Sequence, residues 1–203
     1  MVLTNSTMMQ LGSAMPEFNL ADPDGNVTAS SQFAGLPVLV MFICNHCPYV
    51  KHCAPELARL GADYADKIGI VAIQSNDVSD YPDDSPEKMK LEIAEQGYTF
   101  PYVSDPTQEV AVAFTAACTP DFFLFNADHE LSYRGRLDAT RPTRIRSGVY
   151  DSTGNEPNGE DLRAAIEAVL SSKTPSEEQL PSMGCNIKWT TGKEPDFFSK
   201  SDK

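Results

Sequence analysis

The sequence has few basic residues, and it shows neither a long apolar run nor the pattern of a secretory signal. Lys and Arg number 16 against 29 Asp and Glu, which gives a formal net charge of −13. Such an excess of acid argues against nucleic acid and anionic membrane surfaces as partners. No apolar run approaches the length of a membrane span, and residues 1–12 carry neither a basic residue nor a sustained apolar core. These absences predict a cytoplasmic protein that binds neither nucleic acid nor membranes.

Cysteine is present in an odd number. The five cysteines are Cys44, Cys47, Cys53, Cys118 and Cys185. A chain of 203 residues is long enough to bury a full core without disulfides, and a reducing compartment would not maintain them. Reactive or metal-binding thiols are therefore the better interpretation than a disulfide framework.

The hydrophobic pattern predicts an α/β fold. Largely apolar runs at residues 37–43, 68–74 and 121–125 indicate buried strands. Helical periodicity follows the first two runs, and a hairpin partner at residues 131–138 follows the third. We expect a mixed central sheet flanked by helices, with an N-terminal β-hairpin and a C-terminal tail. The expected organisation is a flexible leader (1–14), one domain (15–172) and a tail (173–203) that is partly packed around residues 181–189.

The segment with the clearest chemistry is Cys44-Asn45-His46-Cys47, which joins a buried strand to a helix. Two cysteines at this spacing can form a disulfide or open to a dithiol with little change of the backbone, and the start of a helix stabilises a thiolate. We expect Cys44, at the exposed N-terminal position, to be the attacking thiolate. Cys47, one turn inside the helix, is then the resolving thiol, and His46 tunes the thiolate.

This segment, together with Cys118-Thr119-Pro120 and the tail segment 184–189, resembles the thioredoxin-like superfamily. The resemblance is greatest to its redoxin branch, which includes AhpC/TSA-like and TlpA/ResA-like proteins, and it covers roughly residues 15–170. It implies a thioredoxin-like fold and a cis peptide bond at Pro120. It also implies that Thr119 offers backbone hydrogen bonds to a substrate peptide.

Three departures from thioredoxin itself concern the tuning of the cysteine pair. Ile43 stands where thioredoxins carry Trp before the first cysteine, and Met41 stands in the place of their buried Asp. The Asn45-His46 dipeptide replaces Gly-Pro and is closer to the His-containing pairs of oxidases and isomerases.

The sequence therefore predicts a thiol-disulfide oxidoreductase. Its Cys44–Cys47 pair would exchange with a disulfide-containing protein or a small thiol substrate, without an organic cofactor and with no metal ligand assigned. Cys118 and Cys185 are candidates for additional redox thiols.

Two alternatives remain. One is a peroxiredoxin-like peroxidase that uses Cys47, with Arg134 or Arg136 as the arginine that polarises the peroxide. The other is a non-enzymatic module that binds copper or zinc through Cys44, Cys47 and nearby His or Cys side chains.

Overall fold

The structure, a computed structural model, describes residues 3–198. The elements in chain order are β1 (Leu3–Asn5), β2 (Asn19–Ala21), β3 (Val27–Ala29), η1 (Ser30–Phe33), β4 (Val38–Phe42), α1 (Pro48–Tyr64), β5 (Gly69–Gln74), η2 (Pro82–Asp84), α2 (Pro86–Gln96), β6 (Tyr102–Ser104), α3 (Glu109–Ala113), β7 (Cys118–Thr119), β8 (Asp121–Phe125), β9 (Leu131–Gly135), β10 (Thr143–Arg146), β11 (Val149–Asp151), α4 (Glu160–Leu170) and β12 (Met183–Asn186). None of the described helices is long and apolar enough to cross a membrane.

A seven-stranded mixed sheet forms the centre of the molecule, in the order β3-β2-β6-β5-β4-β8-β9. β4, β5 and β6 are parallel, whereas β8 pairs antiparallel with β4 and continues into a hairpin with β9. Every residue of β4 and β5 is buried, as expected for strands that are covered on both faces. The predicted α/β fold with a mixed sheet is confirmed, and so is the N-terminal hairpin of β2 and β3.

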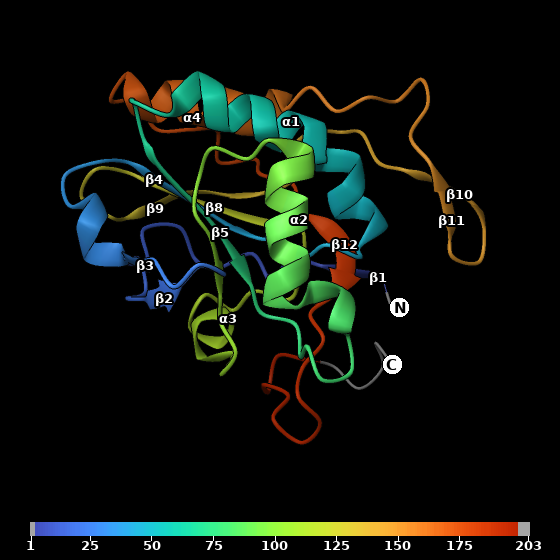
Figure 1. The fold of residues 1–203 in the computed structure, drawn as a ribbon. Coiled ribbons are helices and arrows are strands. Elements are labelled where there is room, and N and C mark those ends of the chain that lie inside the picture. Colours follow the sequence, from blue (N-terminus) through green and yellow to red (C-terminus); the bar gives the residue numbers. More distant parts are fainter. Residues whose placement is uncertain (1–2, 199–203) are drawn as a thin grey trace.

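The two faces of the sheet have separate hydrophobic cores. Leu39 and Met41 of β4 belong to the core that contains residues of α1, α2 and α4. Val38, Val40 and Phe42, which alternate with them, belong to the core shared with α3 and the C-terminal tail. In Figure 1, α1 and α4 lie side by side along one side of the sheet, and α3 lies away from them on the other side.

The two ends of the chain meet in a second sheet, of order β1-β12-β7. β12 pairs with β1 on one side and with β7 on the other (Figure 1). Within the segment 1–14, for which a flexible leader is expected, residues 3–5 pair with β12, and Gly12 N–H donates to Leu131 O. The partner of β1 lies almost the whole chain away in sequence, so no local pattern indicates this pairing.

Two further segments complete the surroundings of the sheet. Residues 140–159 contain the hairpin of β10 and β11. Before the short helix α3, which begins at Glu109, the Asp105 side chain accepts hydrogen bonds from Ala111 N–H and Ser75 Oγ–H.

Candidate active site

Cys47, not Cys44, is the N-cap residue of α1. β4 ends at Phe42, and the residues between it and Pro48 form a short loop that contains both cysteines. Both side chains are buried, with exposed fractions of 1% for Cys44 and 0% for Cys47. The structure therefore corrects the expectation that Cys44 occupies an exposed helix N-terminus with Cys47 one turn inside the helix.

The thiol of Cys44 lies in surroundings that disfavour its charged form. Its Sγ is 3.3 Å from Thr119 Oγ1. Burial raises the pKa of the Cys44 thiol well above its ordinary value, and the negative charges of Cys47 and Asp84 add to the effect. Cys44 is therefore a neutral thiol in the reduced protein.

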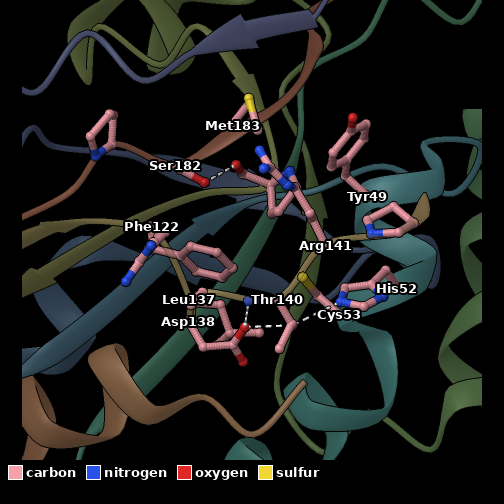
Figure 2. A pocket seen from close by; sticks show the side chains of 15 residues that line it. Tyr49, His52, Cys53, Phe122, Leu137, Asp138, Thr140, Arg141, Ser182 and Met183 are labelled. Atoms are coloured by element: carbon pink, nitrogen blue, oxygen red, sulfur yellow. Dashed lines mark hydrogen bonds between the residues drawn. The ribbon is translucent and has the colours of Figure 1, made fainter. Parts of the chain in front are cut away.

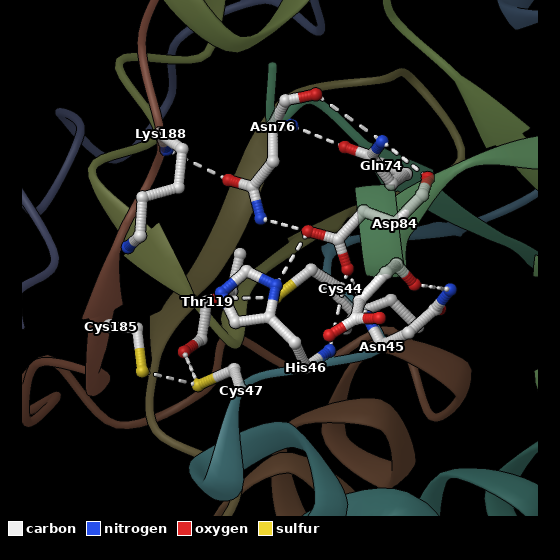
Figure 3. Close-up of polar contacts among 12 residues, drawn as sticks. Cys44, Asn45, His46, Cys47, Gln74, Asn76, Asp84, Thr119, Cys185 and Lys188 are labelled. Atoms are coloured by element: carbon white, nitrogen blue, oxygen red, sulfur yellow. Dashed lines mark hydrogen bonds and ion pairs between the residues drawn. The ribbon is translucent and has the colours of Figure 1, made fainter. Parts of the chain in front are cut away.

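Figure 3 shows the contacts of the Cys47 thiol. Its Sγ lies 2.8 Å from Cys185 Sγ, and it lies 3.1 Å from Thr119 O, to which the protonated thiol donates. Burial would raise the pKa of Cys47, but hydrogen bonds with the thiols of Cys185 and Cys44 and with the N–H groups of Val50 and Cys185 outweigh it, so the pKa lies well below the ordinary value. Within the pair, the helix N-terminus and the surrounding donors make Cys47 the thiolate.

Asp84 is a buried carboxylate that the sequence analysis did not single out. It ends η2 and is 0% exposed. Oδ1 accepts the backbone N–H groups of Asn45 at 2.8 Å and His46 at 3.3 Å. Oδ2 lies 2.7 Å from His46 Nδ1 and accepts Asn76 Nδ2 at 2.8 Å (Figure 3). Asp84 thus fixes the loop between the cysteines and supplies, from another element, a buried acid that Met41 does not provide.

The two residues between the cysteines are held by side chains from the surrounding loops. Asn45 Nδ2 donates to Asp83 O at 2.9 Å, and its Oδ1 accepts Tyr102 Oη–H at 3.1 Å. The His46 ring stacks on Tyr81 with a centroid distance of 5.5 Å. The predicted supporting residues Asn45 and His46 therefore have one defined orientation each.

The peptide bond between Thr119 and Pro120 is cis, as the resemblance implied. However, the strand edge before it is not free for a substrate. β12 occupies this edge, and Cys185 pairs with Thr119 in an antiparallel register. The chain's own tail thus lies where the sequence analysis expected a substrate peptide.

The remaining candidate residues, Cys118, Arg134 and Arg136, have hydrogen-bond partners outside the cysteine pair. Cys118 is buried, with its Sγ 3.5 Å from Pro120 O, and burial raises its pKa. Arg134 donates to Gln179 and Met9, and Arg136 pairs with Asp161. The hydrogen bonds of these arginines therefore give no support to the role in peroxide binding that was considered for them.

A metal could be held by part of the predicted ligand set. Ligand atoms of Cys44, His46 and Asp84 lie within 4.8 Å of one another. His52 instead binds Ser152 and Thr140. Cys44 belongs both to this possible ligand set and to the Cys44–Cys47 pair, so a metal bound here would compete with formation of the disulfide.

Figure 2 shows a pocket whose lining includes Tyr49, Arg141 and Met183. It has a volume of about 190 Å³ and is also lined by Pro120, the residue of the cis peptide bond. Met183 belongs to β12, and Tyr49 belongs to the first turn of α1, two residues after Cys47. The pocket is therefore bounded by the same tail and the same helix start as the cysteine pair.

Comparison with known proteins places this arrangement in a family. The model of the AhpC/TSA family matches residues 11–134, more than half of the chain. A solved structure of an uncharacterised conserved protein from Geobacillus kaustophilus is 46% identical, with a TM-score of 0.86 over 94% of this chain and 98% of that one.

Two curated relatives carry names that refer to redox chemistry. "Putative peroxiredoxin Rv2521" from Mycobacterium tuberculosis is 32% identical over 56% of this chain and 69% of the relative. The thiol-disulfide oxidoreductase YkuV from Bacillus subtilis is 27% identical over 62% of this chain and 84% of the relative. A thioredoxin family protein from Chlorobium tepidum, 17% identical with a TM-score of 0.59 over 79% of this chain and 98% of that one, shares the fold. The chain has a thioredoxin-like fold and belongs to the AhpC/TSA family.

Proposed function

We propose that the protein is a thiol-disulfide oxidoreductase whose reacting pair is Cys44 and Cys47. The observation that carries the proposal is the placement of Cys47. Cys47 is the N-cap residue of α1, and its Sγ interacts with the thiol of Cys44 and lies 3.1 Å from the carbonyl oxygen of Thr119, which precedes the cis-proline. A stabilised thiolate beside a second thiol is the arrangement that disulfide exchange requires.

The proposed cycle conserves electrons. The Cys47 thiolate attacks one sulfur of the substrate disulfide, so that a Cys47–substrate bond forms while the other substrate sulfur leaves and takes a proton. Cys44 then attacks Cys47 Sγ, closing the Cys44–Cys47 disulfide and releasing the second substrate thiol. Two electrons pass from the protein dithiol to the substrate, and the same steps in reverse oxidise a substrate dithiol.

Cys44 must lose its proton before it attacks, and a base lies nearby. The His46 and Asp84 groups that bind each other at 2.7 Å both lie within 4.8 Å of Cys44 Sγ. We propose that this pair accepts the proton from Cys44 as the second step begins. This role assigns a function to Asp84, the buried acid that accepts hydrogen bonds from the loop between the cysteines.

Trapping of the mixed disulfide tests the proposal. The double variant Cys44→Ser/Cys185→Ser leaves Cys47 without its two thiol neighbours, so incubation with oxidised glutathione should add one glutathione to Cys47. Cys53→Ser, which alters a buried cysteine outside the pair, should catalyse reduction of insulin disulfides at the wild-type rate, whereas Cys47→Ser should not. If the adduct forms on another cysteine, or if Cys47→Ser keeps its activity, the proposed cycle is wrong.

Reduction of peroxide is a second candidate, and it is favoured by the same low pKa of Cys47. The thiolate would attack one oxygen of hydrogen peroxide, so that the O–O bond breaks, the other oxygen leaves as hydroxide and takes a proton to form water, and Cys47 becomes a sulfenic acid. Cys44 would then attack Cys47 Sγ, and water would leave as the Cys44–Cys47 disulfide forms. Hydrogen peroxide consumption that requires Cys47 and exceeds the rate of disulfide exchange would establish this activity. Consumption at the same rate in Cys47→Ser would exclude it.

A further inference from the structure

The cycle proposed above leaves one close contact unused. Cys185 Sγ lies 2.8 Å from Cys47 Sγ, although the two residues are 138 positions apart in sequence. Both cysteines are free and buried. Two sulfurs at this separation need only a small movement to bond.

The tail that carries Cys185 is held on the site by several independent contacts. Ser182 Oγ–H donates to Pro120 O at 2.6 Å, and Ile187 N–H donates to Ala117 O at 3.0 Å. Lys188 N–H donates to Asn76 Oδ1 at 2.8 Å, next to the Asp84 cluster. The position of Cys185 therefore results from hydrogen bonds on both sides of it and not from a chance contact of a loose end.

Gly184 shows how closely the tail approaches the edge before the cis-proline. A Cβ atom at this position would lie 2.0 Å from the carbonyl oxygen of Thr119. Only glycine fits there while β12 is paired with β7. The neighbouring Cys185 is thereby placed in register with Thr119, on the edge that a substrate strand would otherwise use.

We propose that Cys185 is a third redox thiol, which exchanges with Cys47, and that β12 presents it as an internal substrate of the site. This inference rests on the proposed role of Cys47 as the reacting thiol. In the oxidised protein, Cys185 attacks Cys47 Sγ, the Cys47–Cys185 bond forms, and the Cys44–Cys47 bond breaks. The proton of Cys185 passes to Cys44, so the step is an isomerisation that needs no further oxidant or reductant.

The exchange has a consequence for access to the site. A Cys47–Cys185 disulfide binds β12 covalently to the edge at Thr119, so no external strand can pair there. With free thiols, as in this structure, β12 is held at the edge by noncovalent contacts alone. The exchange would therefore turn a cover that can detach into one that stays until the Cys47–Cys185 bond is reduced.

Disulfide mapping by mass spectrometry of the full chain tests the inference. After oxidation with diamide, Cys44→Ser should contain a Cys47–Cys185 disulfide and no other, and the wild type should contain both this bond and Cys44–Cys47. Cys53→Ser is the matched control and should give the wild-type pattern. If Cys47 in oxidised Cys44→Ser stays a free thiol or binds another cysteine, the inference is wrong.

A second variant changes the position of β12 on the site but keeps the Cys185 thiol. Gly184→Ala should displace β12 and lower the fraction of Cys47–Cys185 disulfide at least tenfold, while the Cys44–Cys47 disulfide still forms. An unchanged fraction of the Cys47–Cys185 bond would contradict the role given to β12. If the proposed function itself is wrong, the result is different: Cys47 would then form no disulfide with any partner in any variant, including Cys185→Ser.

Discussion

At the scale of single residues, Asp84 holds the loop between the two cysteines in place. It is buried and yet accepts hydrogen bonds from two backbone N–H groups between the cysteines, and both its oxygens are in use. A buried carboxylate with these partners is stable only while all of them remain. The loop that carries the cysteines is therefore coupled to η2, a segment 38 residues further along the chain.

Replacing Asp84 by Asn should lower the free energy of unfolding by about 1–3 kcal/mol, because the new amide donor would face the Nδ2 donor of Asn76. The same change removes a negative charge that raises the pKa of Cys44. Denaturant unfolding measures the first effect, and the pH dependence of alkylation of Cys44 measures the second, which should shift to lower pH.

Asp83→Asn is the matched control for this prediction. Asp83 is exposed, and only its backbone carbonyl oxygen contacts Asn45. The control should leave both measurements at their wild-type values. Equal behaviour of the Asp84 and Asp83 variants would contradict the role assigned to Asp84.

At the scale of elements, local signals predicted the frame of the site well. The all-buried run of β4 and the hairpin of β2 and β3 each depend on residues that are close in sequence. Turn chemistry and strand periodicity are local, so the sequence contains them. The cis bond at Pro120 was predicted from a resemblance and not from such a signal.

What the sequence did not predict depends on contacts between distant segments. The N-cap at Cys47 is fixed by where α1 begins, and helix boundaries shift easily by one or two residues. Asp84 follows another acid in a polar loop and carries no sign of burial in its own neighbourhood. The pairing of β12 with β7 joins segments more than 60 residues apart, which no periodicity can reveal.

The start of β8 carries a prediction about pH. Asp121 is fully buried next to the cis-proline, and burial raises its pKa from 3.8 to about 7. Because the folded state then holds a proton that the unfolded state releases near pH 4, stability should fall as pH rises from about 4 to about 7. Each pH unit corresponds to about 1.4 kcal/mol, so the loss is on the order of 4 kcal/mol.

Urea unfolding at a series of pH values checks this dependence. Asp121→Asn should remove most of the fall, because the amide does not titrate. Asp128→Asn, at the exposed turn after β8, should keep it. A slope of the same size in both variants would show that Asp121 is not its source.

At the scale of the whole molecule, the C-terminal tail is part of the core. Ile187 and Trp189 belong to the hydrophobic core that also contains Phe114 and Val38, and the Trp189 ring packs against Phe197 at 6.1 Å. The tail therefore stabilises the sheet and covers the cysteine pair at the same time. A substitution that weakens the packing of the tail should therefore make the Cys47 thiol more accessible.

Trp189→Ala should lower the free energy of unfolding by about 3–5 kcal/mol, since a buried aromatic ring is removed. It should also speed the alkylation of Cys47 more than that of Cys53, because the tail covers the former. Leu180→Ala, an exposed change in the segment that leads into the same tail, should alter neither measurement. Equal acceleration at Cys47 and Cys53 would indicate general unfolding and not release of the tail.

The central claim is that Cys47 is the reacting thiol of a reversible two-electron couple. Equilibration of the reduced chain in glutathione buffers, followed by acid quenching and disulfide mapping, tests it most directly. The account predicts a disulfide at Cys47, shared with Cys44 or Cys185, with a midpoint between about −270 and −120 mV, the range from thioredoxin to the strongest oxidases. It also predicts that no disulfide forms in Cys47→Ser. A Cys47 that remains a thiol in the most oxidising buffer, or an unchanged disulfide content in Cys47→Ser, would contradict the claim.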